Sequence, residues 1–225
     1  MSTVVFVRHG RTRANADGIL AGWTEGVFLD EEGMQQARTV GLRLADTPLR
    51  AVVASPLDRA QQTADAICAE QPAGLARHTD RDFGEVDYGT WSGRPLRELA
   101  GEDLWQQVQQ HPTSVTFPSG ESMAGMQVRA INAVRHWNGV LGSDATYAIV
   151  SHGDVIKALL ADALGLHLDQ FQRIVVDPCS VSVVRYAQQR PFVLRMNDAG
   201  CDLGAVTRTP PPLGDSSDAV VGGGT

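Results

Sequence analysis

The chain has little of what would mark a secreted, disulfide-linked or membrane protein. Its 225 residues include three cysteines, Cys68, Cys179 and Cys201, and no CxxC pair. That number is too small for a disulfide framework, so we expect a reducing compartment. No signal-peptide pattern precedes the first apolar run, and no apolar run approaches the roughly 18 residues that a membrane span needs. The sequence therefore predicts a cytoplasmic protein with no membrane partner.

Positive charge is also scarce. The chain carries 19 Lys and Arg against 26 Asp and Glu, a formal net charge of −7 at pH 7, and it has no run of basic residues. This balance argues against a nucleic-acid partner. The P-loop, HExxH, GxGxxG and GxSxG motifs are absent too. The nearest approach to a nucleophile elbow, GESMA at residues 120–124, has no convincing strand before it.

What the chain does have is three short apolar runs, each followed at once by polar residues. Runs of this kind, rich in β-branched residues, predict strands that are buried on both faces. The runs and their polar followers are residues 4–7 with Arg8-His9-Gly10, residues 51–54 with Ser55-Pro56 and Arg59, and residues 148–150 with Ser151-His152-Gly153. If the strands are parallel and adjacent, two histidines and two arginines meet at the carboxyl edge, where open α/β sheets bind ligands. We predict the active site there.

Helical spacing and turn residues outline the rest of the chain. The pattern predicts helices from Asp30 to about Ala45, from a Ser55 N-cap onward, from Glu121 to about Leu141, and from Asp154 to Leu164. Residues 12–29 read as a loop, and residues 81–125 as an insert without long periodicity that covers the site. Residues 181–186 and 192–196 favour edge strands. One domain over residues 1–203 is expected, and the Pro-, Ser- and Gly-rich residues 204–225 predict a disordered tail.

Each candidate residue has an ordinary structural alternative. A histidine after one strand is usually a turn residue, but two in the same setting favour catalysis. Gly10 would leave room for a ligand against the backbone. Arg59, in the first turn of a helix where backbone amides already favour anions, is a candidate for phosphate binding. A buried carboxylate near aromatic residues can serve as a general acid, and spacing alone does not choose between Glu85 and Asp87.

Taken together, these motifs resemble the histidine phosphatase superfamily, the phosphoglycerate-mutase-like family, over about residues 3 to 186. The matching stretches are RHG at 8–10, LDEEGMQQA at 29–37, SPLDRAQQTA at 55–64, EVDYGTWSG at 85–93, GES at 120–122 and SHG at 151–153. The resemblance implies a three-layer αβα sandwich with a mostly parallel central sheet. It also implies a phosphohistidine mechanism that needs no metal and no other cofactor.

The resemblance also implies a role for individual residues. His9 matches the nucleophile and Glu85 the general acid, which decides between Glu85 and Asp87. The remaining matches and candidates all concern substrate phosphate: the pocket residues Arg8, Arg59 and His152, the further phosphate contact Asn15, and the substrate-binding candidates Gly22 and Arg11. Arg11 stands where Glu or Gln is frequent, and Ser92 where one form of the motif has Glu. Both lie near the pocket mouth, so they bear on the substrate more than on the chemistry.

These expectations lead to a functional hypothesis. The favoured activity is hydrolysis of a phosphomonoester of a small metabolite, and a phosphoglycerate-mutase-like phosphomutase is the alternative. Residues 86–128 carry Arg94 and Arg97 as their only Lys or Arg side chains, which suits a second phosphate poorly. A metal hydrolase and a silent phospho-ligand binding module are the alternatives from other classes. The oligomeric state stays open, with a homodimer as one option.

Overall fold

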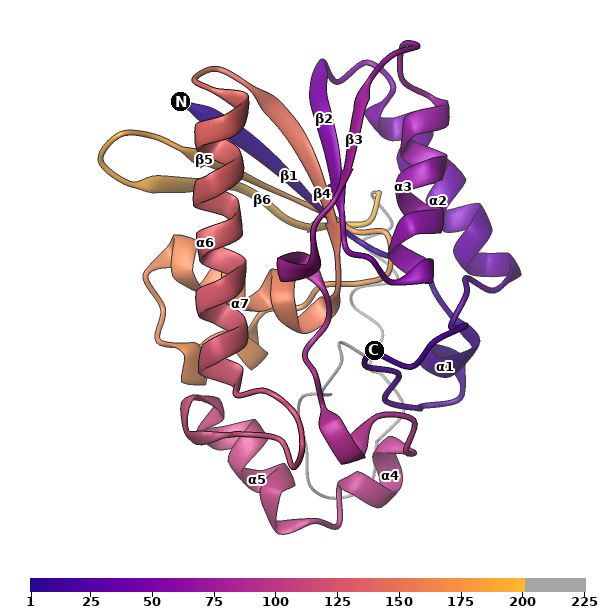
Figure 1. Cartoon of the computed structure of the whole chain (residues 1–225), viewed down its shortest axis with the longest axis vertical. Coiled ribbons are helices and arrows are strands. Elements are labelled where there is room, and N and C mark those ends of the chain that lie inside the picture. The colour runs from indigo at the N-terminus through magenta and orange to yellow at the C-terminus, as the bar shows by residue number, and fades with distance from the viewer. Residues whose placement is uncertain (201–225) are drawn as a thin grey trace.

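A six-stranded sheet with helices on both faces forms the centre of the computed structural model, which describes residues 1–200 (Figure 1). The predicted disordered tail, residues 204–225, lies outside the described residues. The strands are β1 (Ser2–Arg8), β2 (Leu49–Ala54), β3 (Ala76–Thr79), β4 (Thr146–Ser151), β5 (Val181–Tyr186) and β6 (Pro191–Asp198). The helices are α1 (Arg13–Ala16), α2 (Glu31–Leu44), α3 (Asp58–Ala69), α4 (Leu96–Leu99), α5 (Asp103–Gln110), α6 (Met123–Leu141) and α7 (Gly153–Leu164).

The order of the strands is β3-β2-β4-β1-β5-β6. Strands β2, β4 and β1 are adjacent and parallel, with Val150 of β4 opposite both Ala54 and Val7. Strand β3 extends the parallel part, whereas β5 and β6 pair antiparallel. The three predicted strands are therefore neighbours, as expected. Their carboxyl ends meet at one rim of the sheet, which is where polar residues follow each strand.

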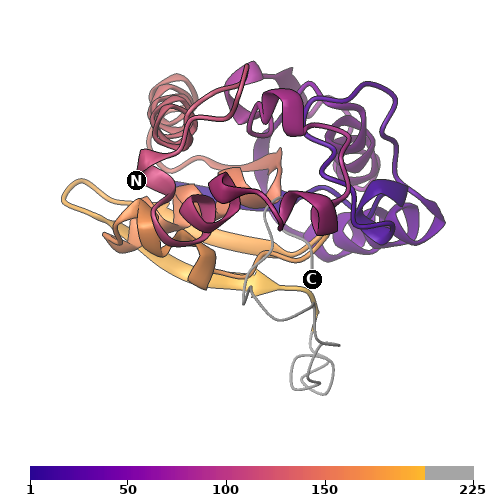
Figure 2. The ribbon, with the colours of Figure 1, turned by 90° about the horizontal axis from the view of Figure 1, so that it is seen from below.

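Successive side chains of β1 enter two different cores. Val4 and Phe6 belong to one buried cluster together with residues of α6 and α7, and Val5 and Val7 belong to a second cluster with residues of α2 and α3. This alternation follows from the two-residue period of a strand that is buried on both faces. Figure 2 shows the helices on the two sides of the sheet. The predicted three-layer αβα architecture is confirmed.

Helix boundaries agree with the sequence in most places. Helix α2 begins after Asp30, whose side chain accepts a hydrogen bond from the Gly33 amide, and α7 ends at Gly165 in a left-handed conformation. The predicted N-cap at Ser55 is wrong: α3 begins at Asp58 after Leu57, which makes no side-chain cap. The Ser55 hydroxyl instead accepts from the Leu57 amide and contacts His152.

Three further differences concern short or edge elements. Residues 12–29 contain the four-residue helix α1, and β3 is a strand that the sequence did not indicate. Strand β5 lies inside the sheet between β1 and β6, so only β6 of the two predicted edge strands lies at an edge. All four residues of β3 are exposed, so β3 has no apolar pattern to reveal it. None of the helices within residues 1–200 is long and apolar enough to span a membrane.

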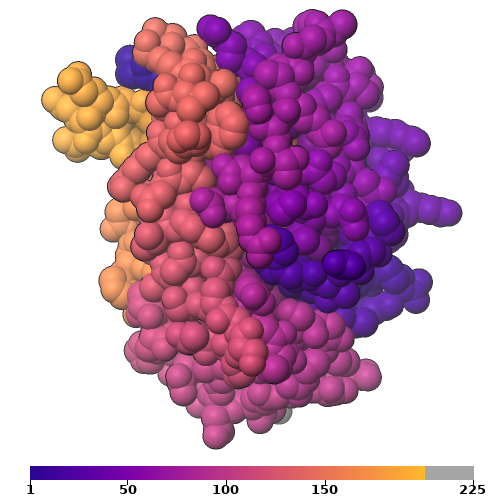
Figure 3. Space-filling view, viewed as in Figure 1, coloured from indigo at the N-terminus to yellow at the C-terminus, as the bar shows by residue number. Residues whose placement is uncertain are grey.

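The predicted insert lies at the carboxyl ends of the parallel strands. It contains α4 and α5, which Figure 1 places below the sheet, and three short 3₁₀ helices, η1 (Arg81–Phe83), η2 (Gly89–Trp91) and η3 (Pro112–Ser114). Trp91, Trp105 and Phe117 are buried there, and the Trp91 ring contacts Trp105 at a tilt and Phe117 edge-on, which joins the insert to the core under α6. Figure 3 shows its surface continuous with that of α6. The insert is therefore a packed layer beside the rim.

Candidate active site

Two histidines face each other where β1 and β4 end. His9 follows β1, His152 follows β4, and their ring centroids are 5.1 Å apart with planes inclined at 57°. The backbone amide of His9 donates to the Ser151 carbonyl oxygen at 2.9 Å, which couples the two strand ends. Both side chains are buried. The parallel pairing of β1 with β4 thus fixes the spacing of the histidines.

The His9 ring has one nitrogen available as a nucleophile. Its Nδ1 lies 2.7 Å from the Gly10 carbonyl oxygen. A carbonyl can only accept, so Nδ1 carries the proton and Nε2 keeps its lone pair. Burial lowers the pKa of His9 well below its ordinary value, and the cations Arg59 and Arg8 lower it further. His9 is therefore a neutral imidazole at ordinary pH, and its Nε2 lone pair accepts a hydrogen bond from Arg59.

Arg59 lies in the first turn of α3 and reaches the same nitrogen. Its Nε is 3.3 Å from His9 Nε2, and its Nη2 donates to the Gly22 carbonyl oxygen at 2.8 Å. Gly22 has φ +52°, and a Cβ there would lie 2.6 Å from Ser92 Oγ, so this backbone requires glycine. No ion pair of the described residues includes Arg59. The guanidinium is a buried cation close to the nucleophile.

Arg8 and His152 flank His9 from the strand ends. Arg8 is fully buried, and its Nη1 donates to the Val176 carbonyl oxygen at 2.7 Å. Nε2 of His152 lies 2.7 Å from Ser55 Oγ. Burial lowers the pKa of His152 well below its ordinary value, and Arg59 and His9 add to this effect. His152 is therefore neutral beside His9, and its Nε2 is engaged by Ser55 while its buried Nδ1 has no partner among the described residues.

Glu85 is a buried carboxyl group on the segment between η1 and η2. Its Oε1 accepts a hydrogen bond from the Val86 amide at 3.0 Å. Burial raises the pKa of Glu85 to about 7, the Asp154 carboxylate raises it as well, and Arg59 and Arg8 oppose the shift. A carboxyl group with this pKa exists in both protonation states near neutral pH. It can therefore donate a proton in one step and accept one in the next.

A cavity of about 30 Å³ is lined by both His9 and Glu85. Five predicted site residues line it: His9, Asn15, Gly22, Arg59 and Glu85. Tyr88 lines it as well, and its hydroxyl donates to Asp154 Oδ2 at 2.8 Å. Asn15 is held in place by Thr12, whose amide and hydroxyl donate to Asn15 Oδ1 at 3.0 and 2.9 Å. The chain thus gathers groups from four separate segments around one lone pair.

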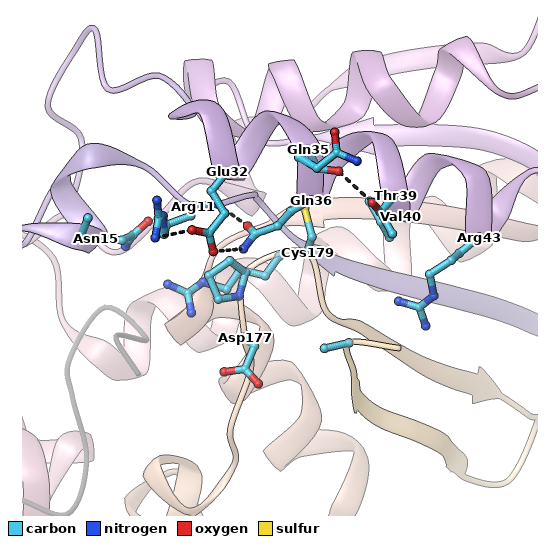
Figure 4. Close-up of a pocket in the computed structure, with 14 residues that line it drawn as sticks. Arg11, Asn15, Glu32, Gln35, Gln36, Thr39, Val40, Arg43, Asp177 and Cys179 are labelled. Carbon is cyan, nitrogen blue, oxygen red and sulfur yellow. Dashed lines mark hydrogen bonds and ion pairs between the residues drawn. The ribbon is translucent and has the colours of Figure 1, made fainter. Parts of the chain in front are cut away.

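Arg11 lies apart from this cavity. It lines a larger pocket of about 560 Å³ beside α2, shown in Figure 4, and Asn15 lines both spaces. Its guanidinium forms ion pairs with Asp30 at 2.8 Å and with Glu32 at 2.6 Å. Arg11 does not line the His9 cavity; it lines the larger pocket together with Arg8 and Asn15.

The structure gives a different reason for a glycine at position 10 from the one that the sequence suggested. A Cβ at Gly10 would lie 2.6 Å from the Gly33 carbonyl oxygen, and one at Gly33 would meet the Arg11 backbone. The two glycines let α2 approach the end of β1, so the space at Gly10 is filled by backbone and not by a ligand. Among residues 1–200, no three His, Cys, Asp or Glu side chains are grouped so as to hold a metal ion.

Comparison with known proteins gives the family. Residues 4–199 match the family model of the histidine phosphatase superfamily, branch 1, and the chain belongs to this family. It is 30% identical to phosphoserine phosphatase 1 of Hydrogenobacter thermophilus over 91% of this chain and 95% of the relative. It is 33% identical to a probable phosphoglycerate mutase GpmB of Erwinia tasmaniensis, over 86% of this chain and 88% of the relative. The solved structure of Bacillus stearothermophilus YhfR superposes with a TM-score of 0.81 at 27% identity. The match covers 88% of this chain and 98% of that one.

Proposed function

We propose that this protein hydrolyses phosphomonoesters of small metabolites through a phosphohistidine at His9 Nε2. The observation that carries the proposal is the lone pair on this nitrogen, in a cavity shared with a buried arginine and with a carboxyl group whose pKa is about 7. Both kinds of relative, the phosphoserine phosphatase and the probable phosphoglycerate mutase, carry names for reactions of small phosphorylated metabolites.

In the first half-reaction, Nε2 attacks phosphorus in line and the bond from phosphorus to the leaving oxygen breaks. Protonated Glu85 gives its proton to that oxygen, so the alcohol leaves neutral. Arg59 Nε–H, which points at His9 Nε2 at 3.3 Å, is placed to bond a phosphoryl oxygen attached there. Arg8, Asn15 and His152 are the proposed further contacts. Charge-assisted bonds from arginine stabilise the negative charge on the transferring phosphoryl group.

In the second half-reaction, Glu85 as carboxylate takes a proton from water, and the water oxygen attacks phosphorus. The bond from Nε2 to phosphorus breaks, inorganic phosphate leaves, and the lone pair returns to the ring. Glu85 ends protonated, as it began. The hydrogen bond from Nδ1 to the Gly10 carbonyl oxygen holds the same tautomer throughout the cycle.

Hydrolysis is favoured over phosphoryl transfer within a substrate because a mutase must bind a second phosphate. In residues 86–128 the Lys or Arg side chains are Arg94 and Arg97, and Arg94 is paired with Glu102. Arg11 is paired with two carboxylates as well. Neutralised cations hold a second phosphate weakly. These pairings support the phosphatase proposal, with the mutase as the alternative.

One measurement separates the two activities. The enzyme is given 3-phosphoglycerate with a catalytic amount of 2,3-bisphosphoglycerate, and 2-phosphoglycerate and inorganic phosphate are followed together. We expect phosphate release to exceed isomerisation, and rapid isomerisation with little phosphate would overturn the assignment. Labelled phosphate trapped on the wild-type protein, acid-labile and base-stable, tests the phosphohistidine. Activity retained after dialysis against a chelator tests independence from metal.

A further inference from the structure

A single arginine on α6 holds the backbone that carries Glu85. Arg129 uses its guanidinium for five hydrogen bonds: Nη1 to the Asp82 oxygen at 2.6 Å and to the Gly84 oxygen at 2.9 Å, Nη2 to the Glu85 oxygen at 3.0 Å, and Nε and Nη2 to the Glu121 carboxylate at 2.9 and 2.6 Å. A guanidinium has five N–H groups, so each has a partner. Three of the five go to backbone carbonyl oxygens between residues 82 and 85, in η1 and in the segment that follows it.

Glu121 extends the same connection to the other side of Glu85. Its Oε1 accepts from the Asp87 amide at 2.9 Å, and its own amide donates to the Asp87 carbonyl oxygen at 2.9 Å. The Trp23 indole also donates to the Glu85 carbonyl oxygen, at 2.6 Å. The backbone is therefore fixed at 82, 84, 85 and 87 by side chains from α6 and its N-terminal flank.

This arrangement matters because Glu85 has no helix or strand of its own. It lies between η1 and η2, where neighbouring residues supply no regular hydrogen-bond ladder. A general acid must reach its proton acceptor at about 2.6–3.2 Å, and displacement of a reacting group by about 1 Å can cost on the order of 100-fold in rate. The hydrogen bonds from Arg129 and Glu121 to the backbone thus set where the carboxyl group stands.

We propose that Arg129 and Glu121 act together as a positioning pair for Glu85, acting on protonation of the leaving group without touching the substrate. The proposal rests on the proposed role of Glu85 as the acid. Neither residue lines the cavity around His9. The pair also gives a physical role to Glu121 in the GES stretch at 120–122, which the chemistry at His9 leaves unexplained.

The test compares two kinds of substrate in variants that leave the cavity intact. Arg129→Lys keeps the positive charge but offers three donors instead of a planar five-donor fork, so it isolates geometry from charge. We expect kcat/KM to fall roughly 10-fold or more for an alkyl phosphate chosen by a phosphate-release screen, since general acid help is worth about 10²- to 10⁴-fold. For p-nitrophenyl phosphate, whose phenolate needs little protonation, the change should stay within about threefold. Arg135→Lys, at an exposed position of the same helix, is the matched control and should change neither value.

A second variant guards against a folding defect. Glu121→Gln keeps an oxygen for the Asp87 amide and loses the charge that holds Arg129, so it should shift the alkyl-to-aryl ratio in the same direction by a smaller factor. If Arg129→Lys melts too low to assay, the Glu121→Gln ratio decides. Unchanged ratios, or equal losses on both substrates, would overturn the positioning role.

Failure of this inference can be told from failure of the proposed function by including Glu85→Gln. A loss selective for alkyl phosphate in Glu85→Gln, with unchanged ratios in the other two variants, removes the positioning pair and leaves Glu85 as the acid. Equal losses on both substrates in Glu85→Gln remove the acid role itself.

Discussion

Two spaces in this protein share Asn15 and differ in almost everything else. The cavity around His9 measures about 30 Å³ and is surrounded by buried groups, whereas the pocket beside α2 measures about 560 Å³. In the cavity, Arg59 directs donors at a histidine lone pair and at a carbonyl oxygen. In the larger pocket, Arg11 pairs with Asp30 and Glu32, and Arg43 donates to Asp198. Arg11 and Arg43 of the larger pocket are thus neutralised by carboxylates, whereas Arg8, which also lines it, is fully buried.

The volume of a pocket is therefore a poor guide to the chemistry of the groups that line it. A cation paired with a carboxylate and partly exposed to water leaves little potential for a bound anion, because the partner and the solvent cancel its field. A buried cation beside a neutral nucleophile keeps its field in a medium of low dielectric constant. Under the proposed function, the phosphoryl group lies in the small cavity although it offers little room, and the rest of the substrate extends outside it.

The largest effect on turnover is expected from removal of the His9 imidazole, the proposed nucleophile of the small cavity. His9→Ala should abolish turnover, because no other group in the cavity offers a lone pair in this position. The fold should persist, since His9 follows β1 and lies outside both apolar clusters. Rapid quench with labelled substrate should show phosphate on the wild-type protein and none on the variant, and circular dichroism should show matching spectra. Normal turnover by the variant would end the proposal.

The next effect in size concerns the acid. Glu85→Gln should slow hydrolysis of an alkyl phosphate by about 10²- to 10⁴-fold and that of p-nitrophenyl phosphate far less, because an amide cannot protonate the leaving oxygen. Steady-state kcat/KM on both substrates measures this. Equal losses would indicate that Glu85 positions the substrate.

A pH profile of kcat/KM tests the protonation states of Glu85 and His9 without any substitution. The first half-reaction needs protonated Glu85, whose pKa is about 7, so kcat/KM for an alkyl phosphate should fall by about tenfold per pH unit above that value. The acid limb should lie well below pH 6.5, because burial and two arginines keep His9 neutral there. Glu85→Gln should remove the alkaline limb. A profile that is flat from pH 6 to pH 9 would contradict these assignments.

The smallest effect is expected in the larger pocket. Arg11→Ala should change kcat/KM by less than about threefold, because Arg11 is paired with carboxylates and does not line the cavity at His9. Arg43→Ala, on the same pocket wall, is the matched control. Exposed ion pairs contribute about 0–1 kcal/mol, so neither variant should melt much lower. A tenfold rise in KM in Arg11→Ala alone would restore Arg11 as a substrate contact.

The sequence predicted the parts of the fold whose signals are local. Buried β-branched runs marked β1, β2 and β4, and Asp30 and Gly165 marked the ends of helices. Strand β3 escaped because all four of its side chains are exposed. The sequence predicted Ser55 as a helix N-cap, but in the structure its hydroxyl contacts His152, which follows another strand. Interactions that are distant in sequence decide such cases.

The residues of the candidate site also divide into those that local signals predict and those that only contacts distant in sequence reveal. His9, His152 and Arg59 follow strands or begin a helix, so topology alone brings them together. Nothing in an amphipathic helix distinguishes Arg129 from an ordinary exposed arginine, and only the folded chain shows its carbonyl partners. The contact of Tyr88 with Asp154 spans 66 positions and has no local signal either. Side chains that support a catalytic group from a distance are thus the hardest to find in a sequence.

The place of β1 in the sheet has a consequence for the growing chain. Val4 pairs with Tyr147 on one side and with Val184 on the other, so both neighbours of the first strand are made late. A ribosome that has just added Gly120 has already produced His9, Arg59 and Glu85, yet β4 and β5 do not exist. Pairing between segments so distant is slow, because a long loop must close before any contact forms. The candidate site is therefore assembled only with near-complete synthesis, and a shortened translation product would carry His9 and Glu85 without the sheet that brings them together.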